Sequence, residues 1–244
     1  KEIEKFKDLI FEQTNSLIES HISNSEEYEK KLEKLDKIRE EIKELSSIEL
    51  NHLKELVNSC KEYGTKTFSC MARYGFIAES FLKSISKKGI WKPERVEEFR
   101  KSIETVLTTF LNELELSRTN PESKRKFIDK YGHLRPGTYD ILAPRYDENF
   151  NRIELINKSQ SKSANEKIVF IPTEEEIDNL NKELSNLGFS FGGVQLIKFM
   201  KAAISGREYG KLIFTKTVSD LIEFIARWGE DIGLSRNELS YISL

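Results

Sequence analysis

Residues 131–147, which read YGHLRPGTYDILAPRYD, constrain the fold of this chain more than any other stretch. Gly132, Pro136, Gly137 and Pro144 interrupt a pattern that is helical on both sides, because proline inside a helix removes a hydrogen bond and clashes with the preceding turn. We therefore expect a long irregular loop between two helical regions. Such a loop is either a candidate functional site, since loops on rigid scaffolds often carry function, or a long turn whose tyrosines and prolines pack against the helices.

Helical periodicity dominates the rest of the chain. Apolar residues recur at spacings of three and four, like a coiled-coil seam, at Tyr28, Leu32, Leu35, Ile38, Ile42 and Leu45. Together with Ile3, Phe6, Ile10 and Leu17, they predict an antiparallel helical hairpin with its turn near 21–25. The charges between the seam positions are typical of a solvated face. The predicted fold class is mainly α, a multi-helix domain with an N-terminal helical hairpin and a long irregular central loop.

Caps and breakers place the remaining elements. Helices are expected over 48–62, ended by Gly64, and over 66–86, closed by Gly89. Further helices are expected from Pro93 through Phe110, from Pro121 through Ile128, over 194–205, over 219–229 and, after Ser235, a last short one. Residues 206–210 either continue the 194–205 helix or kink it. Thr173 and Glu176 form a predicted capping box. Residues 167–171 are expected to form a short strand or an extended lead-in.

The polar run NKSQSKSANE at 157–166 is predicted to separate two helical regions of the chain. It has no apolar anchor, so we expect a flexible linker at 157–166. The helical region 1–156 ends in the central loop, and 167–244 forms a C-terminal helical subdomain that completes the same domain. The chain begins without methionine and already in helical periodicity, which favours a segment of a longer protein.

Composition excludes several functional classes. Charged residues make up 33% of the chain with a net charge of −2, and the two signs are interleaved, so a nucleic-acid partner is not expected. Only Cys60 and Cys70 are present, and no CxxC pair indicates zinc, so no metal site is predicted. No apolar run is long enough to span a bilayer, and no membrane association is expected. Reduced thiols favour the cytoplasm.

Charged residues elsewhere are weaker candidates. Arg73 and Glu79 lie in an apolar helical stretch, either as a structural ion pair or with Arg73 as a substrate anchor. His21 and His52 lie in charged helical stretches and are expected at the surface. No Walker loop, dinucleotide fingerprint or nucleophile elbow is present.

The central loop carries cationic and titratable side chains that are suited to bind an anionic ligand. Arg135 and Arg145 offer planar guanidinium forks for a phosphate or a carboxylate, two ligands that arginine alone does not distinguish. His133 is suited to act as a general base or a hydrogen-bond donor. Asp140 is suited to orient it or to hold a substrate ammonium group.

The same residues carry a family resemblance. YGHLRPGTYDI, followed by PRYDE, resembles the segment that phosphoenolpyruvate-synthase-like phosphotransferases place between their ATP-grasp and phosphohistidine domains. With Thr138 and Tyr139 it is most similar to the L-glutamine kinases of capsular phosphoramidate biosynthesis. A second block, GREYGKLIFTKTVSDLIEFI at 206–225, and the tail LSRNELSYISL also resemble the family. The matches span roughly the last half of the chain, and CMARYGFIAESFLKSISKKG at 70–89 is a weaker match.

The resemblance implies an acceptor-binding domain. In the family, ATP phosphorylates a histidine on a swivelling domain, which carries the phosphoryl group to an acceptor, here the amide nitrogen of L-glutamine, with AMP and phosphate as the other products. Nothing here resembles the ATP-grasp or phosphohistidine domains, so these would be partners in the same polypeptide. ATP and Mg²⁺ would be used there, this fragment would hold no cofactor, and alone it would be inactive.

Roles follow by motif position. The implied catalytic residues are His133 and Arg135, although His133 is not the phosphorylated histidine. The implied substrate-binding residues are Arg73, Tyr131, Thr138, Tyr139, Asp140, Arg145, Arg207, Glu208 and Lys211. Arg207 and Lys211 share a helical face beside Glu208, as a solvated cluster or as part of the acceptor pocket. The alternatives are a related kinase with another small acceptor, and a non-catalytic helical interaction scaffold that uses the 28–45 seam.

Overall fold

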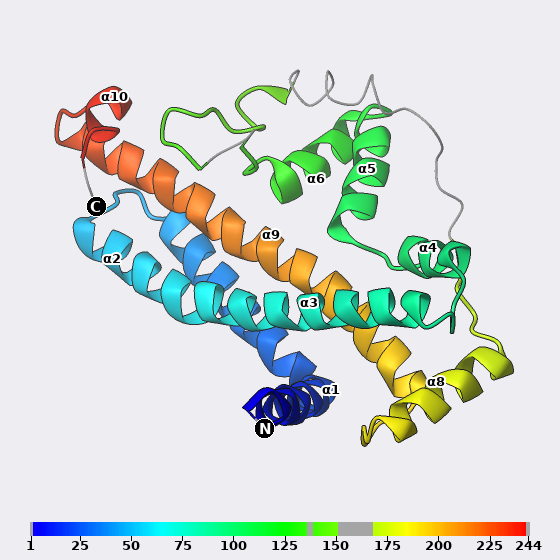
Figure 1. Cartoon of the computed structure of the whole chain (residues 1–244). Helices are drawn as coiled ribbons and strands as arrows, with labels where there is room; N and C mark the ends of the chain where they lie inside the picture. The colour runs from blue at the N-terminus through cyan, green and yellow to red at the C-terminus, as the bar shows by residue number, and fades with distance from the viewer. Residues whose placement is uncertain (1, 136–138, 151–167, 243–244) are drawn as a thin grey trace. The chain divides into compact units, whose positions relative to one another are not determined.

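The computed structural model describes residues 2–135, 139–150 and 168–242, except the side chains of 22–25. Its helices are α1 (Glu2–Lys43), α2 (Leu50–Ser59), the π-helical η1 (Cys60–Thr65), α3 (Lys66–Lys87), α4 (Pro93–Lys101), α5 (Val106–Ser117), α6 (Pro121–Tyr131), α8 (Glu174–Asn186), α9 (Gly193–Asp231) and α10 (Arg236–Leu239) (Figure 1). The predicted mainly α class is confirmed. No strand occurs in the described residues. Of the two structures predicted for 167–171, the short strand is therefore not formed over 168–171, where the backbone is irregular.

The N-terminal helices turn at a different place from the one predicted. α1 continues without a break through 21–25, where no glycine or proline interrupts its hydrogen bonding. The chain instead leaves α1 after Lys43, and α2 begins at Leu50 behind a capping box formed by Glu49 and His52. Ile42 packs in one apolar cluster with residues of α2, so α1 and α2 form the N-terminal helix pair.

Most predicted helix ends are confirmed. Pro93 and Pro121 occupy the first turns of α4 and α6. Thr173 accepts a hydrogen bond from the Glu176 amide in the capping box of α8, and Ser235 caps α10 in the same way. Gly89 follows α3 with a φ of 70°, a left-handed conformation that favours glycine.

Three predicted ends are wrong. Gly64 does not end a helix, because it lies inside η1, where Phe214 packs so closely that an added Cβ would lie 2.8 Å from its Cδ2 atom. The helix predicted from Pro93 through Phe110 is two helices, α4 and α5, separated at 102–105. Continuation of the 194–205 helix through 206–210 was one of two predicted alternatives and is confirmed, because a glycine inside a helix costs only about 1 kcal/mol. The helix predicted to begin at Ser219 is not separate, since α9 runs unbroken through both.

The described chain divides into two compact units, each built from three segments. Unit 1 comprises Lys1–Glu29, Phe68–Thr105 and Asn165–Tyr209, and unit 2 comprises Lys30–Thr67, Val106–Ala164 and Gly210–Leu244. The predicted boundaries at 156 and 167, the linker 157–166 and Lys167 lie outside the described residues, and those boundaries stay predictions.

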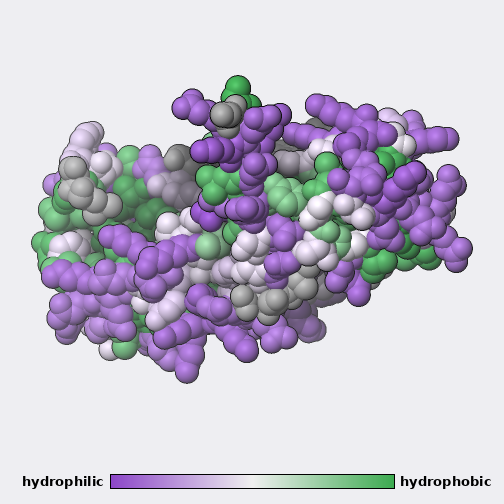
Figure 2. Space-filling model, turned by 60° about the horizontal axis from the view of Figure 1, so that its bottom comes forward, coloured by the Kyte–Doolittle hydropathy of each residue, from purple (hydrophilic) through white to green (hydrophobic). Residues whose placement is uncertain are grey.

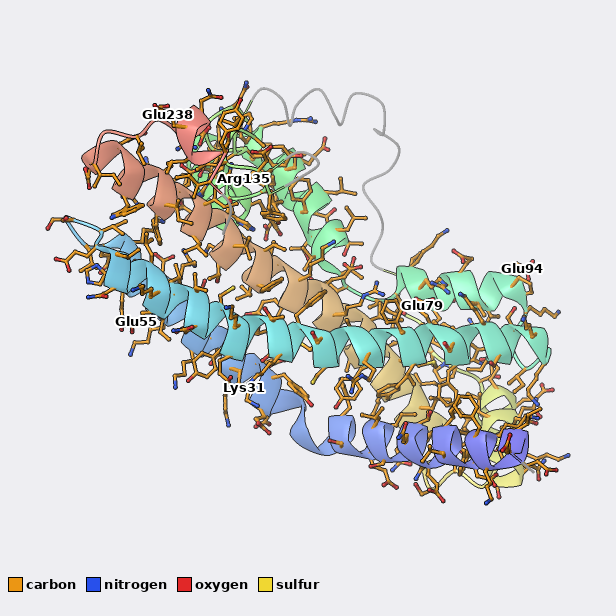
Figure 3. All side chains as sticks on the ribbon, turned by 60° about the vertical axis from the view of Figure 1, so that its left-hand side comes forward. Lys31, Glu55, Glu79, Glu94, Arg135 and Glu238 are labelled. Carbon is orange, nitrogen blue, oxygen red and sulfur yellow. The ribbon has the colours of Figure 1, made fainter. Side chains whose placement is uncertain are left out.

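Unit 1 has one continuous apolar core. It joins Ile18 of α1, Leu82 of α3, Phe99 of α4, Leu180 of α8 and Met200 of α9, each at most 1% exposed. His21, expected at the surface, is buried with it and packs edge to face on the rings of Tyr74 and Phe199. Glu79 pairs with Arg100 through two hydrogen bonds, and Arg73 is exposed, so the predicted pairing of Arg73 with Glu79 is not formed (Glu79 is labelled in Figure 3).

Unit 2 has two smaller apolar clusters. One joins α1, α2 and α9 through Ile42, Leu56 and Phe224. The other joins α5, α6 and α9 through Leu114, Phe127 and Leu212.

Hydrophilic side chains cover most of the face drawn in Figure 2, in keeping with the 33% of charged residues. None of the described helices is long and apolar enough to cross a membrane.

Candidate functional site

The irregular loop after α6 is folded back on itself in unit 2. The amide of Tyr146 donates to the carbonyl of Leu134 over 2.9 Å, and the amide of Asp147 donates to the carbonyl of Gly132 over 3.0 Å. An added Cβ at Gly132 would lie 2.8 Å from the Cβ of Asp147, so this close approach requires glycine. The two ends of the loop therefore lie side by side. Pro136, Gly137 and Thr138 lie outside the described residues.

Arg135 ties the loop to α9 (Arg135 is labelled in Figure 3). Its guanidinium donates to the carbonyls of Asp140 and Ala143 within the loop. It also donates to the Ser219 hydroxyl over 3.2 Å and forms an ion pair with Glu223. The Arg135 side chain is 0% exposed. One guanidinium thus satisfies two loop carbonyls and two α9 side chains, which fixes the loop conformation.

Asp220 of α9 is the second centre of the network. It accepts hydrogen bonds from Arg39 of α1 over 2.6 Å and from Arg145 of the loop over 2.5 Å. Burial alone would raise the pKa of the Asp220 carboxyl, but the charges and hydrogen bonds of Arg145 and Arg39 lower it below its ordinary value. Asp220 is therefore an anion held between two cations.

The other charged groups around Asp220 are also shared. Glu223 pairs with both Arg135 and Arg236, whose hydrogen bonds outweigh burial and lower the pKa of the carboxyl. Burial and the charge of Arg39 lower the pKa of Lys216. Five cations (Arg39, Arg135, Arg145, Lys216 and Arg236) and two carboxylates thus meet around this part of α9, which is typical of a polar site held in fixed geometry.

The His133 side chain is buried near the same charged groups as a neutral imidazole. It is 2% exposed, and neither ring nitrogen has a hydrogen-bond partner among the described residues. Burial lowers the pKa of His133 to about 3; the charge of Asp220 partly opposes this, while Lys216, Arg145 and Arg39 add to it. An imidazole that stays neutral near pH 7 is suited to accept a proton or a hydrogen bond, not to act as a cation.

A pocket of about 390 Å³ opens beside this network. It is lined by Lys43, Arg145, Asp147, Glu148, Asp220, Glu223, Phe224 and Arg227. Within the described part of the chain, Glu148 and Arg227 form no ion pair, and the guanidinium of Arg227 lies over the Phe224 ring, 5.0 Å from its centroid. The pocket therefore presents one carboxylate and one guanidinium that are available to a ligand.

The structure brings only some of the predicted site residues together. Arg145 lines the pocket, whereas His133 and Arg135 are buried and are not among its lining residues. Tyr131, the last residue of α6, is 0% exposed in the apolar cluster of α5, α6 and α9, and burial raises the pKa of its hydroxyl. Tyr139 is 40% exposed, and the Asp140 carboxylate accepts a hydrogen bond from the Leu142 amide. Neither lines the pocket.

The remaining predicted residues lie outside this pocket. Arg73, Arg207 and Glu208 belong to unit 1, and Lys211 is exposed on α9 in unit 2. Arg207 packs against Gly75, where an added Cβ would lie 2.7 Å from its Cδ atom.

Several residues of the network were missed by sequence reasoning. The charges between the seam positions of α1 were predicted to be solvated. This is wrong for Arg39, which is 0% exposed. Asp220 and Glu223 lie in the second resemblance block, three residues apart on one helical face, and that spacing was the available signal. The described residues contain no group of three or more His, Cys, Asp or Glu that could hold a metal ion. Searches of protein-family models, curated proteins and solved structures found no match to this chain.

Proposed function

We propose that this chain is the acceptor-binding part of an ATP-dependent phosphotransferase, and that its acceptor is L-glutamine. In this proposal, a phosphohistidine on another domain of the same polypeptide transfers its phosphoryl group to the side-chain amide nitrogen of glutamine. ATP and Mg²⁺ act at an ATP-grasp domain, and the present chain binds and orients the acceptor.

The observation that carries the proposal is the mixed charge of the pocket in unit 2. An amino acid has a carboxylate and an ammonium group, which need a cation and an anion at separate places. Arg227 and Glu148 provide these charges, and neither is neutralised by an ion pair among the described residues. A volume of about 390 Å³ falls within the range of about 300–1,000 Å³ that is usual for small-molecule pockets.

The network beneath the pocket supports a division of roles. Arg145 is held by Asp147 and Asp220, so its guanidinium is fixed at the pocket wall, where it can stabilise charge on a transferred phosphoryl group. Arg135 acts one layer deeper, as the residue that fixes the loop. This modifies the roles expected from motif position, in which Arg135 was a catalytic residue and Asp140 a substrate-binding residue.

The interaction-scaffold alternative has less support. Its feature is the seam of α1, but Leu32, Leu35 and Ile42 are at most 4% exposed within the chain itself. A seam that is already buried offers little apolar surface to a second protein.

Calorimetric titration with L-glutamine tests the proposal directly. We expect saturable binding in the millimolar range, and Arg227→Gln and Glu148→Gln should each weaken it about 3- to 5-fold, as for a partly exposed charge pair. Glu230→Gln is the matched control, because Glu230 is exposed on α9 three residues from Arg227 and does not line the pocket.

Two analogues make the test specific. N-acetylglutamine lacks the ammonium charge, so Glu148→Gln should no longer affect its binding. Glutaminamide lacks the carboxylate, so Arg227→Gln should no longer affect its binding. Absence of glutamine binding by a folded sample, or equal effects of both variants on all three ligands, would refute the proposal. Tighter binding of another amino acid would instead reassign the acceptor.

A further inference from the structure

Unit 1 contains a second pocket that has no part in the proposed function. It has a volume of about 510 Å³ and lies between α1, α3, α8 and the start of α9. Its floor is formed by the unit 1 core, where Ile85, Leu180, Leu184 and Leu196 are each at most 3% exposed. The pocket is therefore an opening that reaches the apolar core from the surface.

The rim of this pocket is apolar as well. Ile10 of α1 is 47% exposed, Phe76 of α3 is 65% exposed, and Leu187 after α8 is 50% exposed. Large apolar side chains held at this exposure around a concave, apolar surface are typical of a ligand-binding site, because a ligand that covers them removes apolar area from water.

The polar groups of the pocket are nearly all satisfied internally. The hydroxyls of Ser80 and Ser84 donate to backbone carbonyls of α3, at 2.8 and 2.9 Å. Lys88 and Glu183 form an ion pair with each other. Arg73 also lines the pocket, and its guanidinium has no carboxylate partner in the described part of the chain. A lone cation at the edge of an apolar cavity is complementary to a ligand with an apolar body and a single negative charge.

We propose that this pocket binds a small amphipathic monoanion of the fatty-acid type, with its hydrocarbon part on the Leu180–Leu196 floor and its carboxylate at Arg73. The proposal is independent of the acceptor site, because the two pockets are lined by different residues in different units. It gives Arg73 a role different from the acceptor-binding role expected in the sequence analysis.

The test uses decanoate and its uncharged counterpart 1-decanol, titrated into the 244-residue chain by calorimetry, each below its solubility limit. We expect saturable one-site binding of both, with decanoate binding more tightly. Arg73→Gln should weaken decanoate about 3- to 5-fold and leave decanol unchanged, since an exposed charge pair contributes this much. Lys83→Gln is the matched control, because Lys83 is exposed on α3 and does not line the pocket.

A second variant tests the cavity. Ser80 is exposed, so Ser80→Trp should fill the pocket without loss of helical content and abolish binding of both compounds. Glutamine binding in unit 2 should be unchanged in both variants. The proposal is overturned if a folded sample binds neither compound, if decanol and decanoate bind equally, or if Ser80→Trp with native circular dichroism still binds decanoate.

Discussion

Replacing Asp220 by asparagine is expected to destabilise unit 2 far more than the loss of one surface charge would. The Asp220 side chain is 4% exposed and lies between Arg39, which is 0% exposed, and Arg145, which is 14% exposed. Asparagine has nearly the same size, so no cavity forms. The variant removes the negative charge and replaces one of the two acceptor oxygens by an amide NH2 group, which cannot accept from its guanidinium.

The expected magnitude follows from the partners that remain. Removing one member of a buried ion pair costs about 3–5 kcal/mol, because the other charge stays buried without compensation. Arg39 retains Asp36 and Glu40, and Arg145 retains Asp147, so the lower end, about 3 kcal/mol, is expected. Asp36→Asn is the matched control: it removes a 34% exposed partner of the same Arg39 and should cost about 1 kcal/mol or less.

Urea unfolding followed by far-UV circular dichroism measures both variants. A double-mutant cycle with Arg39→Met should give a coupling free energy of about 1–3 kcal/mol between Arg39 and Asp220. Asp220→Asn leaves the buried Arg39 charge without this partner, and Arg39→Met removes that charge, so the two costs should not add. Equal costs for Asp36→Asn and Asp220→Asn, or strict additivity in the cycle, would refute the idea that Asp220 is the buried centre of this network.

Two further predictions concern the loop and α9. Because burial lowers the pKa of His133 to about 3, the folded chain binds fewer protons than the unfolded chain below about pH 6.5, so stability falls as the pH drops; from pH 7 to pH 5 the loss should be about 2 kcal/mol. His133→Asn should remove that part of the pH dependence in urea titrations, and an unchanged slope would contradict the assignment. Gly132→Ala should cost about 1–3 kcal/mol, since its Cβ would lie 2.5 Å from the Ile128 carbonyl oxygen. Gly206→Ala, inside α9, should be neutral or stabilising in the same urea titrations, because its added Cβ would meet only the flexible end of the Met71 side chain, at 3.3 Å; equal losses for both would show that close contact with the backbone is not the cause.

Local signals explain which parts of the fold could be predicted. The caps at Thr173 and Ser235 and the prolines that open α4 and α6 depend on neighbours within one turn, so the sequence pattern was sufficient. The prediction of a turn near 21–25 was wrong, because serine and asparagine can cap a helix but do not prevent one from continuing.

The site could be predicted only in part, because its partners are far apart in sequence. The loop motif located Arg135 and Arg145, but Arg39 lies among alternating charges, and its buried partner Asp220 is 181 residues away. No periodicity distinguishes one such arginine from its solvated neighbours. Glu148 and Arg227 were missed because what marks them is that neither forms an ion pair with another described residue, which only the folded structure shows.

The bracing of the loop by Arg135 also determines when the pocket can form during synthesis. The α9 partners of Arg135, Ser219 and Glu223, follow it by 84 and 88 residues, so the loop cannot adopt its final hydrogen bonding until Glu223 has left the ribosome. Closing so long a segment carries an entropy cost that the nascent loop alone cannot offset. Chains truncated before Ser219 should retain α5 and α6 but leave the motif residues unorganised, which makes the motif a poor candidate for transfer into another scaffold.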